Sequence, residues 1–267
     1  MRVSEIAVEA TDLTLAYGSH VAIAASSFVV PRPGITAVVG PNGSGKSTLL
    51  NAIAGLLTPM SGRVEVHTAT RREISYVLQT TRVNNSLPVT VEEVVTMARY
   101  ASVGRFRRLT KRDREAVSKA MERTGIVEVR RRHLHHLSGG QRQRTFVAQG
   151  LAQEHSILLL DEPLSGIDVT TSQAIDKVIH KEVDDGCAVI LTTHDLTEAS
   201  VADHVILVAG RVVATGPPTL VMTPENLAAA YGTSVLHPGE GLTLIDDPAH
   251  TPTDTWHSHR AVRHPEA

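Results

Sequence analysis

Apolar and polar positions follow different periods along the chain. Residues 6–30 alternate between them, with turn residues at Tyr17-Gly18-Ser19, which predicts antiparallel strands. Residues 63–77 show a similar alternation, and we expect the two segments to pair in one small sheet. From Val89 to Ala152 the period becomes helical, which predicts a mainly α-helical region.

Later segments are continuously apolar, which is typical of strands buried on both faces. They are Ile157 to Leu160 and Ala188 to Thr193, and a further strand is expected over His204 to Val208. The segment Thr171 to Val183 has the pattern of a crossover helix between the first two strands. This alternation of strand and helix predicts the α/β class.

Composition changes this picture at the end of the chain. Residues 236–267 are rich in Pro, Gly, Asp and His, which predicts a flexible tail behind one domain over residues 1–235. The tail includes Trp256-His257-Ser258-His259. Its imidazoles suit weak binding of Zn, Cu or Ni, or they belong to a disordered tail that binds nothing.

Charge and cysteine content exclude several classes of protein. The net charge of −2 argues against a general nucleic-acid binder. The single cysteine, Cys187, allows no disulfide framework within one chain and is expected to be a reduced core thiol. No segment has the ~18 continuous apolar residues that a membrane span needs, and the acidic N-terminus does not look like a signal peptide. We expect a protein that is cytosolic or sits on a membrane through a partner.

A glycine-rich loop carries the strongest chemical signal. It follows the apolar run Ile35–Val39 and precedes a helical pattern, so it should present helix N-terminal N–H groups to a polyphosphate. Lys46 supplies a charge for the β and γ phosphates, and the Ser47 hydroxyl suits Mg²⁺. The loop, called the phosphate loop below, consists of Gly40, Pro41, Asn42, Gly43, Ser44, Gly45, Lys46, Ser47 and Thr48.

Three further segments carry polar or charged groups. Residues 137–141, Leu-Ser-Gly-Gly-Gln, predict a capped helix N-terminus that is either a second anion cradle or an ordinary cap. Asp161 and Glu162 end a predicted parallel strand, at the edge where open α/β sheets bind ligands. The basic segment 105–114 indicates either a solvated face or contact with an anionic surface.

These motifs, in this order, resemble the ATP-binding subunit of an ABC transporter over about residues 6–233. The resemblance implies a P-loop NTPase fold with a RecA-like core, an antiparallel β subdomain and a helical signature subdomain over about residues 84–150. It also implies ATP and Mg²⁺ as cofactors and ATP hydrolysis as the reaction. Residues 137–141 correspond to the family's signature and are called the signature below.

The resemblance assigns catalytic roles to individual residues. Asp161 and Ser47 would hold Mg²⁺, directly or through water. Glu162 would orient the attacking water as general base, because phosphoryl transfer to water depends on positioning and charge stabilisation. Gln79 would touch Mg²⁺ or that water through its amide oxygen, unless it is only a loop residue.

Two more positions match family motifs, and two depart from them. His194 would contact the γ-phosphate as the switch histidine, although a histidine at a strand end is often structural. Tyr17 would stack on adenine, or it only packs against neighbouring residues of the protein. Leu78 stands where proline is common, and Ile167 replaces a usual leucine. Neither departure removes a catalytic group.

The family places the signature in trans. It forms a head-to-tail dimer in which each signature closes the other copy's ATP site, which implies a two-fold pair. Ser138, Gly139, Gly140 and Gln141 would then contact the partner's ATP, and Asp168 would cross the interface.

The run from Leu87 to Tyr100 resembles the metal-chelate import subfamily, which carries Zn²⁺, Mn²⁺ or iron species. This implies a membrane-spanning permease, an extracytoplasmic metal-binding protein as an indirect partner, no nucleic acid, and a peripheral place on the cytoplasmic face of the membrane. Alternatives are another importer, such as one for iron-siderophores, and an ABC ATPase outside transport. The short separation of Lys46 from Ser138 argues against the coiled-coil repair ATPases. Intact Glu162, His194 and Gln79 argue against a module that does not hydrolyse.

Overall fold

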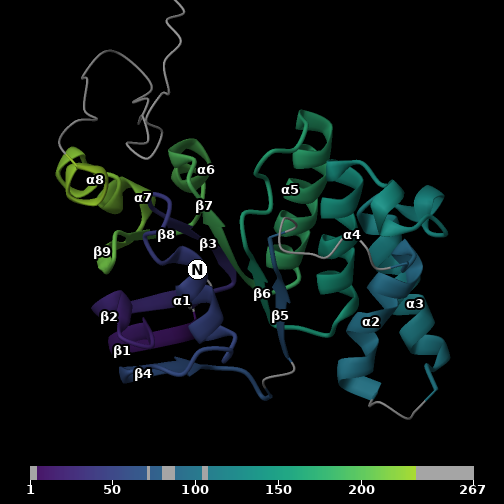
Figure 1. Cartoon of the computed structure of the whole chain (residues 1–267), viewed down its shortest axis with the longest axis horizontal. Coiled ribbons are helices and arrows are strands. Elements are labelled where there is room, and N and C mark those ends of the chain that lie inside the picture. Colours follow the sequence, from purple (N-terminus) through teal and green to yellow (C-terminus); the bar gives the residue numbers. More distant parts are fainter. Residues whose placement is uncertain (1–4, 71–72, 80–87, 104–107, 233–267) are drawn as a thin grey trace, which may run out of the picture.

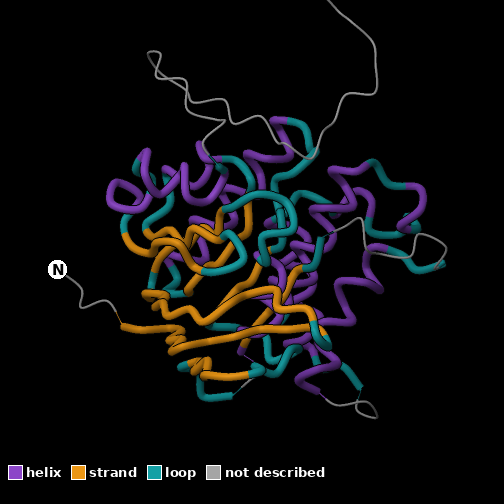
Figure 2. The backbone as a smooth tube through the Cα atoms, turned by 60° about the vertical axis from the view of Figure 1, so that its left-hand side comes forward, coloured by secondary structure: helices purple, strands orange, loops and turns teal. Residues whose placement is uncertain are grey.

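Two sheets and a separate group of helices organise the molecule (Figures 1 and 2). The computed structural model describes residues 5–70, 73–79, 88–103 and 108–232. The predicted tail over 236–267 lies outside the described residues, as does part of the basic segment. Among the described residues, no helix combines the length and apolar character needed to cross a bilayer.

The smaller sheet is antiparallel and has the strand order β2-β1-β4. β1 (Glu5–Tyr17) and β2 (His20–Arg32) form a hairpin around Gly18 and Ser19, and Gly18 takes a left-handed φ of 60°. β4 (Ser61–Val66) pairs with the other edge of β1. The prediction of antiparallel strands over residues 6–30 is therefore confirmed.

The larger sheet has six strands in the order β5-β6-β7-β3-β8-β9, and only its last pair is antiparallel. The predicted strands over 157–160, 188–193 and 204–208 are confirmed as β6, β7 and β8. The strands are β3 (Gly34–Val39), β5 (Ile74–Val77), β6 (Ile157–Leu160), β7 (Ala188–Thr193), β8 (His204–Val208) and β9 (Val212–Gly216).

One sheet assignment from the sequence is wrong. The alternation over 63–77 was expected to form strands of a single small sheet, but only β4 joins β1. β5 instead pairs in parallel with β6, with Ile74 opposite Ile157 and Val77 opposite Leu160. Alternation predicts a strand but does not predict which strand it pairs with. Three of the four residues of β5 are buried, which fits a place at the edge of the larger sheet.

The larger sheet is covered on both faces, which explains its continuous apolar strands. Ile157 and Leu159 of β6 face the core shared with α1 (Lys46–Ile53) and the antiparallel sheet. Leu158 and Leu160 face the core shared with α5 (Val169–Asp184). The predicted crossover helix is thus confirmed as α5. The short helices α6 (Leu196–Ser200), α7 (Pro218–Val221) and α8 (Pro224–Tyr231) complete this core lobe.

Three helices form a second body, the helical lobe, around their own apolar core (Figure 1). They are α2 (Val91–Val103), α3 (Lys111–Arg123) and α4 (Gly139–Ala152), with short 3-10 turns at Val127–Val129 and Leu134–His136. Arg99 of α2 ties them together, because its guanidinium donates to Asp113 of α3 at 2.9 Å and to the Ala152 carbonyl at 3.0 Å.

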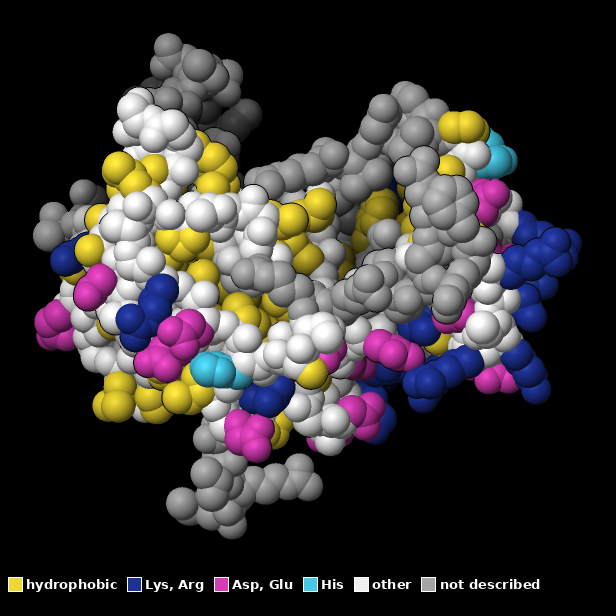
Figure 3. All heavy atoms as spheres, turned by 90° about the horizontal axis from the view of Figure 1, so that it is seen from below, with side chains coloured by type: hydrophobic (Ala, Val, Ile, Leu, Met, Phe, Trp, Pro, Cys, Tyr) yellow, Lys and Arg dark blue, Asp and Glu magenta, His cyan; other side chains and the backbone are white. Residues whose placement is uncertain are grey.

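Basic side chains gather at the end of the molecule that carries α3 (Figure 3). Arg108, Lys111, Arg112 and Arg114 are exposed there. Lys111 pairs with Glu115 at 3.6 Å and Arg112 with Glu154 at 2.9 Å. Such exposed pairs contribute about 0–1 kcal/mol each, so these contacts do not distinguish a solvated face from a surface that contacts an anionic partner.

Candidate functional site

The phosphate loop joins β3 to α1 at the carboxyl edge of the larger sheet. Gly43 and Gly45 take left-handed φ values of 77° and 104°, which side chains disfavour. A Cβ on Gly40 would lie 2.0 Å from the Val208 carbonyl oxygen, and one on Gly45 would lie 2.4 Å from Ile23. The loop can therefore keep this path only with glycine at these positions.

Lys46 begins α1 and is 7% exposed. Its Nζ donates to the carbonyl oxygens of Gly40 at 2.8 Å and Pro41 at 3.1 Å. These bonds hold the ammonium across the inside of the loop. Gly45 caps α1 without a side chain, so the leading N–H groups of the helix face the same space.

A cavity of about 320 Å³ opens beside this loop. Its walls come from three separate parts of the chain, which are the antiparallel sheet, the phosphate loop and the carboxyl edge of the larger sheet. The cavity therefore brings together most of the residues that the sequence predicts for one nucleotide. It is lined by Tyr17, His20, Ala22, Asn42, Gly43, Ser44, Gly45, Lys46, Ser47, Thr48, Gln79 and Glu162.

Tyr17 forms the antiparallel-sheet wall of this cavity and is 50% exposed. Its hydroxyl accepts a hydrogen bond from Asn51 Nδ2 at 3.2 Å, and Asn51 Oδ1 accepts one from Tyr76 at 3.2 Å. Asn51 of α1 therefore fixes the ring that was predicted to stack on adenine. Sequence reasoning missed Asn51, because its position in the helix carries no motif.

Asp161 lies at the end of β6 and is 2% exposed. Its Oδ1 accepts hydrogen bonds from Ser47 at 2.9 Å and Thr192 at 2.7 Å. Its Oδ2 is buried and has no hydrogen-bond partner among the described residues. A buried carboxylate oxygen next to a hydroxyl costs free energy unless a cation or water meets it. Oxygen donors of this kind are what Mg²⁺ prefers, so Asp161 and Ser47 fit that ion.

Glu162 is the next residue and has a left-handed φ of 49°. A non-glycine residue in this region costs about 1–3 kcal/mol, and such strain is common at functional sites. Its N–H donates to Thr192 Oγ1 at 2.8 Å, and its Oε2 accepts from Gln79 Nε2 at 2.7 Å. The structure thus joins Gln79 and Glu162, which lie far apart in the sequence.

Thr192 near the end of β7 holds both carboxylate residues in place, since its hydroxyl donates to Asp161 and accepts from Glu162. Sequence reasoning missed it. The signal that could have identified it is its position two residues before His194, on the strand between the phosphate loop and β6.

His194 follows β7 and is exposed. It is not among the described residues that line the cavity. Nearby, burial raises the pKa of the Glu198 carboxyl, and the Thr193 hydroxyl, which donates to it at 2.6 Å, opposes that rise. The charge of Asp195 raises this pKa further, that of His194 lowers it, and that of Glu162 raises it. The charges of His194 and Glu162 therefore both influence the pKa of the Glu198 carboxyl.

The signature occupies the N-terminus of α4 and does not line the cavity among the described residues. Ser138 accepts a hydrogen bond from the Gln141 N–H at 3.3 Å, and Gln141 accepts one from the Ser138 N–H at 3.2 Å. This reciprocal capping box confirms the predicted cap. α4 and α1 lie on opposite sides of β5 and β6 in Figure 1, so one chain does not bring the signature to its own phosphate loop.

Asp168 lies beside the signature, because a Cβ on Gly140 would be 3.1 Å from its Oδ2. Asp168 caps α5, accepting from the Thr171 N–H at 2.9 Å and the Thr171 hydroxyl at 2.8 Å. These bonds lower the pKa of the Asp168 carboxyl. Within one chain, Asp168 therefore has a structural role next to the signature.

Comparison with known proteins places this geometry in a family. The family model described as ABC transporter matches residues 23–165. The chain is 40% identical to the chelated iron transport system membrane protein YfeB of Yersinia pestis, covering 88% of this chain and 83% of the relative. It is 41% identical to the manganese transport system ATP-binding protein MntA of Synechocystis, covering 75% and 80% of the two chains. It is 39% identical to the zinc transport system ATP-binding protein TroB of Treponema pallidum, covering 85% and 87%.

Solved structures agree. The fold matches a metal-chelate type ABC transporter in an inward-facing conformation with a TM-score of 0.75 and 26% identity, over 85% of this chain and 88% of that one. It matches a dimeric ATP-binding cassette with ADP and phosphate with a TM-score of 0.69 and 25% identity, over 79% and 98%. The chain therefore belongs to the ABC transporter family, as an ATP-binding subunit that hydrolyses ATP.

Proposed function

We propose that this subunit powers the import of a transition metal, as the free ion or as a chelate, through a separate membrane-spanning permease. Zinc or manganese is the first candidate cargo, and an iron-siderophore is the second. The relatives named above support this, since their names describe chelated iron, manganese and zinc transport. The siderophore alternative is supported by 35% identity to the ferric enterobactin transport ATP-binding protein FepC of Escherichia coli.

The chemistry would take place at the carboxyl edge of the larger sheet. Mg²⁺, when bound, would neutralise charge on the β and γ phosphates, and Ser47 and the unpartnered Oδ2 of Asp161 would hold it. Lys46 would transfer its hydrogen bonds from loop carbonyls to phosphate oxygens. Tyr17 would offer its exposed ring to adenine.

Glu162 would be the general base that orients the attacking water. Its Oε2 accepts a hydrogen bond from Gln79, which orients the carboxylate so that Oε1 can accept one from the water. His194 would move toward the γ-phosphate on closure. Its exposed position at the end of β7 leaves room for that movement.

The proposed assembly rests on one observation. Within one chain, the signature is separated from the phosphate loop. A second copy in head-to-tail orientation would supply its Ser138, Gly139, Gly140 and Gln141 to this chain's ATP, with Asp168 at the interface. The pair would lie on the cytoplasmic face of the membrane, bound to the permease, and an extracytoplasmic metal-binding protein would deliver the cargo. No nucleic acid takes part.

The variant Glu162→Gln tests the chemistry and the assembly together. Removing the base should lower ATP turnover by about 10²- to 10⁴-fold, while ATP binding is retained because the phosphate contacts are unchanged. With Mg-ATP, light scattering should show this variant as a dimer. The matched control, Glu115→Gln on exposed α3, should turn over ATP like the wild type. A variant that hydrolyses normally, or never dimerises, would refute the proposal.

The cargo is tested separately in cells that lack this subunit. Uptake of labelled zinc, manganese and a ferric siderophore should fall for one of them and recover on complementation. Loss of siderophore uptake alone would reject the free-metal proposal in favour of the second candidate.

A further inference from the structure

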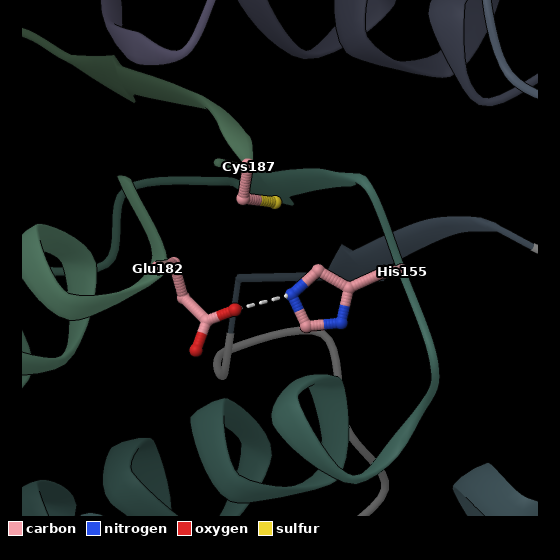
Figure 4. Close-up of side chains that lie close together, drawn as sticks. All are labelled: His155, Glu182 and Cys187. Atoms are coloured by element: carbon pink, nitrogen blue, oxygen red, sulfur yellow. Dashed lines mark ion pairs between the residues drawn. The ribbon is translucent and has the colours of Figure 1, made fainter. Parts of the chain in front are cut away.

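The opposite edge of the larger sheet carries a group of side chains that ATP hydrolysis does not use (Figure 4). His155 lies just before β6, Glu182 lies in the last turn of α5, and Cys187 lies just before β7. This places them at the amino ends of the strands whose carboxyl ends face the nucleotide. The sequence predicted only that Cys187 is a buried thiol, which the structure confirms.

The three side chains converge on one small space. One ligand atom from each lies within 4.8 Å of the others. The side chains of His155 and Glu182 are 5% and 9% exposed, and Cys187 is 5% exposed. His155 Nε2 lies 2.9 Å from Glu182 Oε2 as an ion-pair contact, and Nε2 has no hydrogen-bond partner among the described residues.

Outer contacts orient two of these side chains. The Nδ1 of His155 lies 2.7 Å from the Gln153 carbonyl oxygen, so Nδ1–H donates there and Nε2 points inward. Arg123, at the end of α3, pairs with Glu182 through Oε1 at 2.5 Å and leaves Oε2 facing the cluster. Known metal sites use such second contacts to fix the tautomer of a histidine and the direction of a carboxylate.

We propose that His155 Nε2, Glu182 Oε2 and Cys187 Sγ form a binding site for one divalent transition-metal ion of the zinc class. A thiolate, an imidazole and a carboxylate are the donors that Zn²⁺ uses, and three protein ligands leave a fourth position for water. The thiolate and the carboxylate would together neutralise the dication. This site is distinct from the Mg²⁺ position at Asp161 and does not depend on which cargo the transporter carries.

Protons compete with the metal at this site. Burial opposes the charged form of His155, but contacts with Cys187 and Glu182 and the Gln153 carbonyl raise its pKa to about 10. A metal ion would displace the proton from Nε2 and the proton from the thiol, so its binding releases protons. An imidazolium–carboxylate ion pair that binds no metal is the competing interpretation.

The site lies where the two lobes meet, because Arg123 belongs to α3 of the helical lobe and Glu182 to the core lobe. Metal binding would restrict the Glu182 carboxylate further. It would thereby stabilise the Arg123–Glu182 contact between the lobes. This gives the metal a route to influence how the helical lobe sits on the core.

Cobalt titration of the full-length, reduced protein tests the site directly, without nucleotide. Because the chain has a single cysteine, a thiolate-to-cobalt charge-transfer band can come only from Cys187. The band should saturate at one ion per chain and disappear when Zn²⁺ is added. Histidines of the tail could bind cobalt as well, but they cannot produce this band.

Variants then assign the other ligands. His155→Gln and Glu182→Gln should each weaken cobalt binding at least about tenfold, and Arg123→Gln should weaken it about 10- to 100-fold as an orienting contact. The control His180→Gln, on exposed α5 surface, should leave the band unchanged. Absence of the band in the wild type would overturn the proposal without any variant having to fold. An unchanged affinity in both ligand variants would overturn it too.

Discussion

The helices of the two lobes have different N-terminal caps. In the core lobe, the N-cap of α1 is Gly45, which has a left-handed φ of 104° and no side chain to cap the helix. In the helical lobe, the N-cap of α4 is Ser138, whose side chain forms a capping box with Gln141, and α3 has the same arrangement at Thr110 and Asp113. The first N–H groups of α1 therefore remain available to a ligand. In α3 and α4, by contrast, the capping side chains already accept hydrogen bonds from some of these groups.

This difference shows how the work of binding is divided. The box at α4 uses the N–H groups of Ser138 and Gln141, and those of Gly139 and Gly140 are not part of it. The helix start is therefore stable within one chain and keeps only a partial anion site. A phosphate would bind strongly at α1 and weakly at α4, which suits the dimer proposed above, one that forms on ATP and separates after hydrolysis.

The largest effect that tests this division is expected at Lys46. Lys46→Ala removes charge-assisted hydrogen bonds of about 1.5–3 kcal/mol each from the phosphates, so ATP should bind at least about a hundredfold more weakly. Fluorescent-nucleotide titration measures this directly. Lys119→Ala, at an exposed lysine of α3, is the matched control. If Lys46→Ala binds ATP like the wild type while remaining folded, the phosphate loop is not the main binding site.

A smaller effect distinguishes the two signature glycines. A Cβ on Gly140 would lie 2.6 Å from Thr171 Oγ1, whereas one on Gly139 meets nothing within 4 Å. Overpacking of this kind typically costs about 1–3 kcal/mol, so Gly140→Ala should lower the free energy of unfolding by that amount. Gly139→Ala should change it by no more than about 0.5 kcal/mol. Urea unfolding of both variants provides the comparison.

The same pair tests the signature's role in trans. Because Gly139 has open space in one chain, any loss of ATP turnover in Gly139→Ala must arise from a partner or nucleotide that approaches it. We expect turnover to fall at least about tenfold with unfolding unchanged, as a methyl group would block close approach to the γ-phosphate. Normal turnover in Gly139→Ala would contradict the proposed contact.

Features that lie within one short segment could be predicted from the sequence. The phosphate loop needs only its own glycines, Lys46 and the strand and helix beside it. The caps at Thr110 and Ser138 need only a residue three positions later. In each case the hydrogen-bond partners lie within one turn, so spacing alone determines the geometry.

Features that depend on strand neighbours could not be predicted in this way. Thr192 reaches Asp161 because β7 pairs with β6 in a register that sets Leu191 opposite Leu160. β5 was misplaced for the same reason, since its pattern does not say which strand it joins. The cluster of His155, Glu182 and Cys187 unites three segment ends, and none of them carries a recognisable spacing.

The smallest expected effect compares the two capping boxes of the helical lobe. Hydrogen bonds from the Thr110 hydroxyl and N–H outweigh burial and, with Arg99, lower the pKa of Asp113 to about 2. A depressed carboxyl pKa contributes stability that is present above the unfolded value of about 3.9 and is lost as the pH falls toward the folded value.

Thr110→Ala removes the largest cause of that depression, so it should cost about 1 kcal/mol near neutral pH and progressively less between about pH 4 and pH 2. The box at α4 contains no titratable group, because it joins a serine to a glutamine. Ser138→Ala should therefore cost about 1 kcal/mol at every pH in this window. Urea unfolding of both variants across the window measures the two costs. Equal pH dependence in the two variants would show that the Asp113 charge does not distinguish the caps.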